Sequence, residues 1–238
     1  MNLAAFFAAA LLTTQAQAPV SVPQRVPGGE VVRVGERPNI LVRAPDARGS
    51  LVVLTGGNGR LGVGEGATVS ENATNVLIRN ADRFAARGFN VLLVEEGTDL
   101  SEAVEHARRL ARPVTVVATS AGTPRAAEGL LAGASPDRLI LTSGFLSEAS
   151  GPSRSVSDIL GDPVRLPPTL VIHHRSDDCR FTRPEGVPPF IAWAAGKASV
   201  LWFEGGAEAG NPCRFAAHHG FAGQDDELAD AVADFAAR

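Results

Sequence analysis

Four side chains that could perform nucleophilic catalysis follow apolar, strand-like runs of the sequence. Ser120 comes directly after the run at 114–119. Asp177 and Asp178 come shortly after the run at 169–173, and His219 follows the run at 199–203. A serine hydroxyl is a weak nucleophile until a neighbouring base takes its proton, and an acid that orients this base completes the set. These residue types indicate acyl-transfer chemistry if the fold brings them together.

The segment around Ser120 has the pattern of a sharp turn between a strand and a helix. Such a turn strains the serine backbone and brings strand and helix close together, so the residues two before and two after the serine must be small. Ala118 and Gly122 occupy these positions, where the usual pattern has glycine at both. The methyl group of Ala118 is a departure that leaves a non-catalytic binding protein open as an alternative.

The placement of these residues depends on an alternation of strands and helices. Two short strands at 31–34 and 39–42 are predicted to form a hairpin. Further strands are predicted at 50–55, 90–94, 114–119, 138–142, 169–173 and 199–203, and helices at 69–87, 100–111, 124–132 and 225–236. Continuous apolar strands that alternate with helices predict a three-layer α/β/α sandwich, with a mostly parallel sheet of about eight strands. Ligands of such sheets bind beyond the carboxyl ends of the strands.

The bulk composition is that of a globular chain. The 238 residues are 45% hydrophobic and 20% charged, which is typical of a single domain. The net charge of −4, without a basic run, argues against a nucleic-acid partner. The sequence contains no tyrosine, which excludes a mechanism built on a tyrosine acid or base.

The first 18 residues have the features of a secretory signal peptide. The apolar run at 3–12 is too short to span a bilayer, and the small residues that follow it fit cleavage after Ala16 or Ala18. Residues 19–28 are predicted to be a proline-rich leader and residues 29–238 the domain. We therefore expect a periplasmic or secreted protein without a membrane anchor.

The two cysteines are consistent with export. An exported chain with two cysteines is expected to pair them, so Cys179 and Cys213 are predicted to form a disulfide, with two buried thiols as the alternative. Cys179 lies two residues after Asp177, and Cys213 lies six residues before His219. A disulfide would join the loop that contains Asp177 to the loop that precedes His219. We expect it to restrict the geometry of Asp177 relative to His219.

The order Ser, Asp, His, with each residue after a strand, resembles that of the α/β-hydrolases. The chain is similar to a small exported bacterial serine hydrolase of that superfamily, esterase-like or dienelactone-hydrolase-like, over about residues 29–238. It also resembles a subgroup that carries one cysteine just after the acid and another before His-Gly-Phe. The resemblance implies cleavage of a carboxylic ester through an acyl-enzyme intermediate, without a cofactor, and leaves a thioester or an amide as alternative substrates.

The same resemblance assigns roles to individual residues. Ser120 would be the nucleophile and His219 the base, because such families place the histidine directly before Gly-Phe, which excludes His218. Asp177 would be the acid, since the family pattern His-x-x-Asp expects it there, and Asp178 is the alternative.

The tetrahedral intermediate of this reaction needs hydrogen-bond donors for its oxyanion. The backbone N–H of Ala121 is one expected donor. The second is expected from the glycine-rich loop at 56–59, from Asn58 or, as the next choice, from Gly57. With only about 26 residues between 142 and 169, the site is expected to be open or thinly lidded, so a small substrate and one presented on a surface are both feasible. Residues 150–168 are expected to form the rim of the site, with a simple linker as the alternative.

Two further interpretations compete with a serine hydrolase. The glycines at 57, 59 and 62 form a G-x-G-x-x-G pattern after a strand, which is typical of dinucleotide binding, but the next strand-end acid is Glu95, 33 residues beyond Gly62 and not about 20. A metal-dependent hydrolase is suggested by a cluster of potential ligands, which are His173, His174, Asp177, Asp178, Cys179, His218 and His219. Neighbouring strand residues such as His173 and His174 point to opposite faces of the sheet, so at most one of them can face a metal site together with the loop residues.

Overall fold

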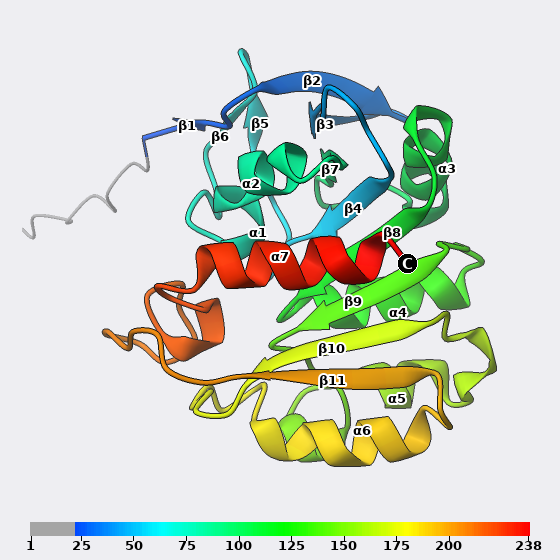
Figure 1. Cartoon of the computed structure of the whole chain (residues 1–238), viewed down its shortest axis with the longest axis vertical. Helices are drawn as coiled ribbons and strands as arrows, with labels where there is room; N and C mark the ends of the chain where they lie inside the picture. The colour runs from blue at the N-terminus through cyan, green and yellow to red at the C-terminus, as the bar shows by residue number, and fades with distance from the viewer. Residues whose placement is uncertain (1–21) are drawn as a thin grey trace, which may run out of the picture.

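A twisted central sheet organises the computed structural model, which describes residues 22–238 (Figure 1). Its eight strands are, in chain order, β2 (Gly29–Val34), β3 (Arg37–Val42), β4 (Ser50–Leu54), β7 (Asn90–Leu93), β8 (Val114–Thr119), β9 (Arg138–Thr142), β10 (Thr169–His174) and β11 (Ala198–Phe203). They lie in the order β11-β10-β9-β8-β4-β7-β3-β2. Neighbours from β11 to β7 are parallel, whereas β3 is antiparallel to both of its neighbours. The predicted hairpin and mostly parallel sheet are confirmed.

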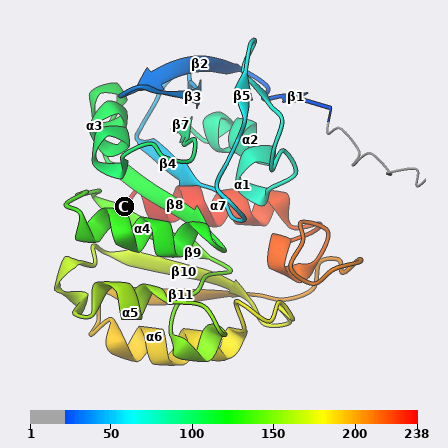
Figure 2. The same ribbon diagram turned by 180° about the vertical axis from the view of Figure 1, so that it is seen from behind.

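Helices cover both faces of this sheet, as the two opposite views show (Figures 1 and 2). The helices are α1 (Val76–Arg79), α2 (Ala81–Ala86), α3 (Leu100–Leu110), α4 (Gly122–Leu131), α5 (Val156–Leu160), α6 (Val187–Trp193) and α7 (Asp225–Ala236). Helices α1, α2 and α7 pack on one face around one hydrophobic cluster, and α3 to α6 pack on the other around a second cluster. The predicted three-layer α/β/α sandwich is confirmed.

The central strands follow from their apolar sequences. Every residue of β4 and β8 is buried, as expected for strands covered by helices on both faces. Strand β11 lies at the edge of the sheet, and its residues alternate between half-buried and exposed until Phe203. The segment after β8 therefore leaves the sheet near its middle, whereas the segments after β10 and β11 leave it toward one edge.

The prediction of one helix at 69–87 is wrong over the first part of that range. Val69 belongs to a short strand, β6 (Thr68–Val69), and the helical residues form two pieces, α1 and α2. The side chain of Asn75 accepts a hydrogen bond from the Leu77 N–H at 3.0 Å and starts α1. Asn80 leaves the helical conformation between the two pieces, with φ −103° and ψ 7°. Asparagine side chains compete with the helix for backbone hydrogen bonds. The spacing of apolar residues, from which the helix was predicted, does not reveal this effect.

A small second sheet connects the start of the described chain to the domain. It contains β1 (Gln24–Arg25), β6 and β5 (Val63–Gly64), in the order β1-β6-β5. Val26 is buried, and its N–H donates to the carbonyl oxygen of Ala67 at 2.9 Å. Part of the predicted leader at 19–28 thus packs against the domain. The predicted signal peptide, residues 1–18, lies outside the described residues.

Within residues 22–238, no helix combines the length and the apolar character that crossing a bilayer requires.

Candidate active site

Ser120 occupies a strained turn between β8 and α4. Its φ of 51° lies in the left-handed region, which residues other than glycine rarely adopt. Its N–H donates to the Thr142 carbonyl oxygen at 3.0 Å, and its own carbonyl oxygen accepts the N–H and the hydroxyl of Thr123. A Cβ atom at Gly122 would lie 2.5 Å from the Leu54 carbonyl oxygen, so only glycine fits there. The turn is held by backbone contacts with the two strands beside β8.

Asp177 and His219 form a buried pair at the carboxyl end of β10. Asp177 Oδ2 lies 3.0 Å from His219 Nδ1, and the two residues are 1% and 7% exposed. The other carboxylate oxygen, Oδ1, accepts the Cys179 N–H at 3.0 Å. Asp178 is exposed and makes no hydrogen bond to His219 within the described part of the chain. The geometry for orienting the imidazole therefore belongs to Asp177.

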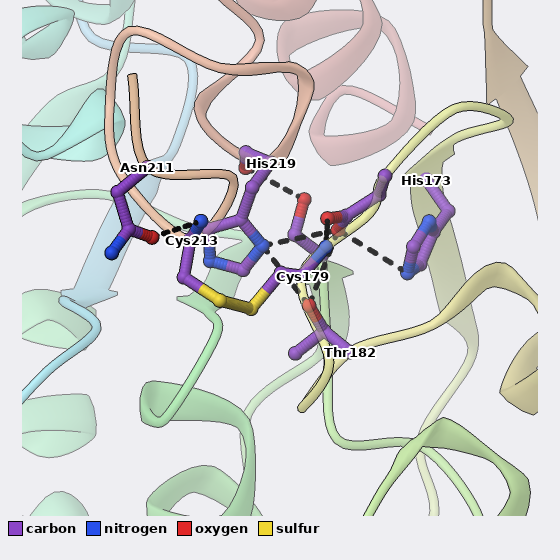
Figure 3. Close-up of a disulfide and its surroundings, with 8 residues drawn as sticks. His173, Cys179, Thr182, Asn211, Cys213 and His219 are labelled. Carbon is purple, nitrogen blue, oxygen red and sulfur yellow. Dashed lines mark hydrogen bonds and ion pairs between the residues drawn. A yellow bond between two sulfur atoms is a disulfide. The ribbon is translucent and has the colours of Figure 1, made fainter. Parts of the chain in front are cut away.

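Two residues that were not predicted from the sequence also contact this pair, and Figure 3 shows one of them, Thr182, beside His219. The Thr182 hydroxyl donates to Asp177 Oδ2 at 3.2 Å, and its oxygen lies 3.0 Å from His219 Nδ1. The Ser143 hydroxyl donates to the His219 carbonyl oxygen at 2.9 Å. Ser143 directly follows β9, so the rule that located the other strand-end residues also reaches it, whereas no sequence signal marks Thr182.

The neighbouring histidines of β10 are both buried. His173 Nδ1–H donates to the His174 carbonyl oxygen at 3.1 Å, and His173 Nε2 lies 3.9 Å from Asp177 Oδ2 without a hydrogen-bond partner among the described residues. Burial lowers the pKa of His173, so the ring is held neutral despite the nearby carboxylate. His174 Nε2–H donates to the Gly205 carbonyl oxygen at 2.9 Å, and burial also lowers its pKa.

A disulfide joins the loop that contains Asp177 to the loop that precedes His219, as predicted. Cys179 and Cys213 are bonded, with Cα atoms 4.6 Å apart across a sequence separation of 34. Figure 3 shows the bridge beside the imidazole of His219. The Cys213 N–H donates to Asn211 Oδ1 at 2.9 Å, which closes a tight turn on the base side.

Two hollows meet at Ser120. The smaller, about 120 Å³, is lined by Ser120 and His219 together with Gly57 and Phe215. The larger, about 560 Å³, is lined by Ser120, Gly57 and Ala121 and extends over the disulfide. Within the described residues, no hydrogen bond joins Ser120 Oγ to His219, and such contacts are often long before substrate binds.

The rim of these hollows differs from the prediction. None of the residues at 150–168 lines either hollow. That segment contains α5, whose Val156, Ile159 and Leu160 are buried in the cluster beneath α4. The proline and serine content had suggested an exposed rim, but Ser155 caps α5 and allows the apolar residues to pack. The rim consists instead of residues at 178–181 and 211–215.

The two candidates for the second oxyanion donor lie differently. Gly57 lines both hollows, whereas Asn58 lines neither. The Asn58 side chain is engaged within its loop, where Nδ2 donates to Glu71 Oε2 at 2.9 Å and Oδ1 accepts the Arg60 N–H at 3.1 Å. A Cβ atom at Gly56 would lie 3.0 Å from Ser120 Cβ, which shows how closely this loop passes the serine.

The G-x-G-x-x-G segment binds a carboxylate of the protein itself. The N–H groups of Leu61 and Gly62 donate to the Glu95 carboxylate at 2.9 Å, and that of Val63 does so at 3.2 Å. The segment then enters β5 and not the helix whose N-terminus would hold a pyrophosphate. The dinucleotide interpretation is therefore not supported by this geometry.

Arg125 connects the loop after β4 to the helix α4. Its guanidinium donates to the carbonyl oxygens of Thr55 and Ala121. Burial lowers the pKa of Arg125. The arginine fixes the loop after β4 relative to the first turn of α4, and the sequence carried no signal for this contact.

A metal site is not favoured by the chemistry of the ligands. Asp177, Cys179 and His219 place their ligand atoms within 4.8 Å of one another, the one such group among the described residues. The Cys179 sulfur, however, is bonded to Cys213, and the thiolate is the form that binds metals. Two protein ligands remain, which is fewer than the three that a catalytic zinc site uses.

Comparison with known proteins identifies the fold. The sequence matches no protein-family model and no curated protein. Among solved structures, the esterase domain of a Rhodothermus marinus protein aligns with a TM-score of 0.60 at 13% identity, over 88% of this chain and 97% of that one. A Pyrococcus furiosus esterase gives 0.59 at 13% identity, over 87% and 89%. An α/β serine hydrolase without a lid from Xanthomonas campestris gives 0.55 at 14% identity, over 92% and 94%. The chain therefore has the α/β-hydrolase fold.

Proposed function

We propose that this protein is a serine hydrolase that cleaves carboxylic esters through an acyl-enzyme intermediate. Ser120 Oγ attacks the carbonyl carbon while His219 Nε2 takes its proton, and Asp177 stabilises the resulting imidazolium. The tetrahedral intermediate collapses as His219 gives the proton to the leaving alcohol. Water, activated by the same histidine, then releases the carboxylic acid and restores the serine. The similar solved structures include esterases, which supports this reaction class.

One observation carries the proposal. The buried 3.0 Å contact between Asp177 Oδ2 and His219 Nδ1 fixes the tautomer in which Nε2 is free to accept a proton, and His219 shares a hollow with a strained serine at the end of the central strand β8. A histidine oriented by a buried carboxylate, beside a serine, is the arrangement expected of a base that activates a nucleophile.

The oxyanion would be bound by backbone N–H groups. Ala121 supplies one, since it follows the nucleophile and lines the larger hollow. Of the two candidates in the loop after β4, Asn58 and Gly57, we favour the N–H of Gly57 because Gly57 lines both hollows. Removal of one such donor costs about 3 to 4 kcal/mol of transition-state stabilisation.

A fluorophosphonate probe tests the proposal, because it reacts only with an activated serine. We expect the probe to modify Ser120, as read by mass spectrometry of the peptides, and turnover of a short-chain ester to disappear in Ser120→Ala. Ser101→Ala on α3 is the matched control and should behave as the wild type. A folded protein that shows neither labelling nor turnover would contradict the proposal and favour the alternative of a non-catalytic binding protein. Loss of activity with a chelator would point to a metal-dependent hydrolase.

We also propose that the protein is exported to the periplasm or secreted. The disulfide between Cys179 and Cys213 supports an oxidising location, as does the signal-like sequence at 1–18. Its substrate would be a small or surface-presented ester. N-terminal sequencing of the protein recovered from the producing cells should find a new terminus after Ala16 or Ala18, and an intact Met1 in the cytoplasmic fraction would contradict export.

A further inference from the structure

A short sequence motif occurs twice beside the candidate site. Cys-Arg-Phe is found at 179–181 and again at 213–215, and the disulfide joins the two cysteines. The bridge therefore brings together Arg180 and Arg214 from loops that lie after different strands. Arg180 and Phe181 line the larger hollow, Phe215 lines the smaller one, and Arg214 lines both.

The two guanidinium groups have no acidic partner of their own. Within residues 22–238, neither Arg180 nor Arg214 takes part in an ion pair. Arg180 lies over the ring of Phe181, 4.6 Å from its centroid, which orients the guanidinium and leaves its N–H groups available. The larger hollow also contains one carboxylate, Asp178, so it carries a net positive charge in a chain whose net charge is −4.

The hollows can be assigned to the two halves of an ester. His219 must protonate the leaving alcohol, and it lines the smaller hollow but not the larger. The acyl chain and the leaving alcohol extend from the reacting carbon in different directions, so the acyl chain would take the other hollow that Ser120 lines. The leaving group therefore belongs in the hollow of about 120 Å³ and the acyl chain in that of about 560 Å³.

We infer that the preferred substrates are monoesters of dicarboxylic acids with a small alcohol, an inference that rests on the proposed function. The free carboxylate of the acyl chain is ionised at neutral pH and would bind Arg180 and Arg214. The methylene chain would lie along the rings of Phe145 and Phe181, whose centroids are 6.3 Å apart. Ser120 would attack the ester carbonyl at the other end of the chain.

The first test compares two esters that differ only at the end of the acyl chain. Monomethyl glutarate and methyl pentanoate share a leaving group and a chain length, and acid release by the complete protein is followed in a pH-stat. We expect kcat/KM to favour the glutarate by about tenfold, which corresponds to one charge-assisted contact. The preference should shrink as salt is raised, because exposed charges are screened. A ratio of one or less overturns the inference.

Substitution of the arginines assigns that preference. Arg180→Gln and Arg214→Gln should each lower the ratio of the two kcat/KM values, and the double variant should bring it to about one. Arg183→Gln is the matched control, since Arg183 is an exposed arginine of the same loop that lines neither hollow, and its ratio should equal the wild-type value. A double variant that melts at the wild-type temperature and keeps the full preference excludes these side chains as the anion site.

Calorimetry with Ser120→Ala separates the two proposals. Monomethyl glutarate should bind this variant, and the additional loss of Arg180 and Arg214 should weaken binding by about tenfold. Arginine-dependent binding without any turnover by the wild type would overturn the hydrolase function alone. Equal turnover of both esters, without arginine-dependent binding, would overturn the dicarboxylate inference alone.

Discussion

The two sides of the candidate site are held in place by different forces. The turn at Ser120 lies between the fully buried strand β8 and the helix α4, and close backbone contacts at Gly122 and Ser120 restrict its conformation. The acid and base loops lie after β10 and β11, toward the edge of the sheet, and the residues at 204–212 are all exposed. A disulfide and a few polar contacts hold these loops. Packing thus positions Ser120, whereas cross-links position His219.

The largest effect is expected on the nucleophile side. Ser120→Gly should lower turnover on the order of 10⁴-fold or more, while its melting temperature stays at or above that of Ser120→Ala. Glycine accepts the φ of 51° at no steric cost, which offsets its larger entropy loss on folding. Ester turnover and thermal unfolding measure the two quantities. A glycine variant that melts well below the alanine variant contradicts strain at this turn.

The acid side should be nearly as sensitive. Asp177→Asn removes the charge that orients and stabilises the His219 ring, so turnover should fall by about 10³- to 10⁴-fold. Asp178→Asn is the matched control, because this exposed carboxylate makes no hydrogen bond to His219 within the described chain, and turnover of the uncharged methyl pentanoate should stay close to the wild-type rate. The reverse ranking would assign the acid role to Asp178.

Removal of the cross-link should affect both stability and rate. Replacement of Cys179 and Cys213 by alanine should lower the free energy of unfolding by about 3 to 4 kcal/mol, because the bridge closes a loop with a sequence separation of 34. Turnover should fall by roughly ten- to a hundredfold if the bridge also aligns Asp177 with His219. Denaturant unfolding and ester turnover test the two parts. A lower stability with unchanged turnover would confine the bridge to a structural role.

Lowering the pH should destabilise the folded protein through His173 and His174, the two buried histidines of β10. Burial lowers the folded-state pKa of His173, so below about pH 6.5 the unfolded chain takes up a proton that the folded chain does not. Stability is therefore complete above this pH and falls as the pH is lowered, by up to about 1.4 kcal/mol per unit for each such histidine. His173→Gln should flatten the melting temperature between pH 7 and 5, and His174 should account for part of the remaining slope. An unchanged slope would place the titrating group elsewhere.

The smallest effect is expected at the position that departs from the usual glycine. Ala118 is fully buried at the end of β8 and fits there beside Ser120. Ala118→Gly should therefore cost about 0.5 to 1 kcal/mol of stability, because glycine loses more chain entropy, and should leave turnover close to that of the wild type. Urea unfolding and ester turnover measure these values. A marked gain in turnover would show that the methyl group obstructs the turn.

The contrast between the two sides also explains what could be predicted from the sequence. The strands and most helices follow from apolar runs and their caps, so β8, β9 and α7 have the predicted boundaries. The nucleophile turn is local in sequence and was visible as a motif. The contacts of Thr182 with His219 and of Arg125 with Thr55 join distant segments through single hydrogen bonds, and no periodicity marks them. The rim at 178–181 and 211–215 depends on how the disulfide folds two loops together.

The loop after β4 is held by the carboxylate of Glu95, a side chain of the protein itself, and not by a bound ligand. Three N–H groups of the loop donate to a side chain of the protein itself, which lies at the neighbouring strand end and is present whether or not a substrate is bound. The shape of the loop is therefore independent of how much substrate is present. The part of the loop at 61–63 is therefore ordered before a substrate arrives, and no binding energy is needed to order it.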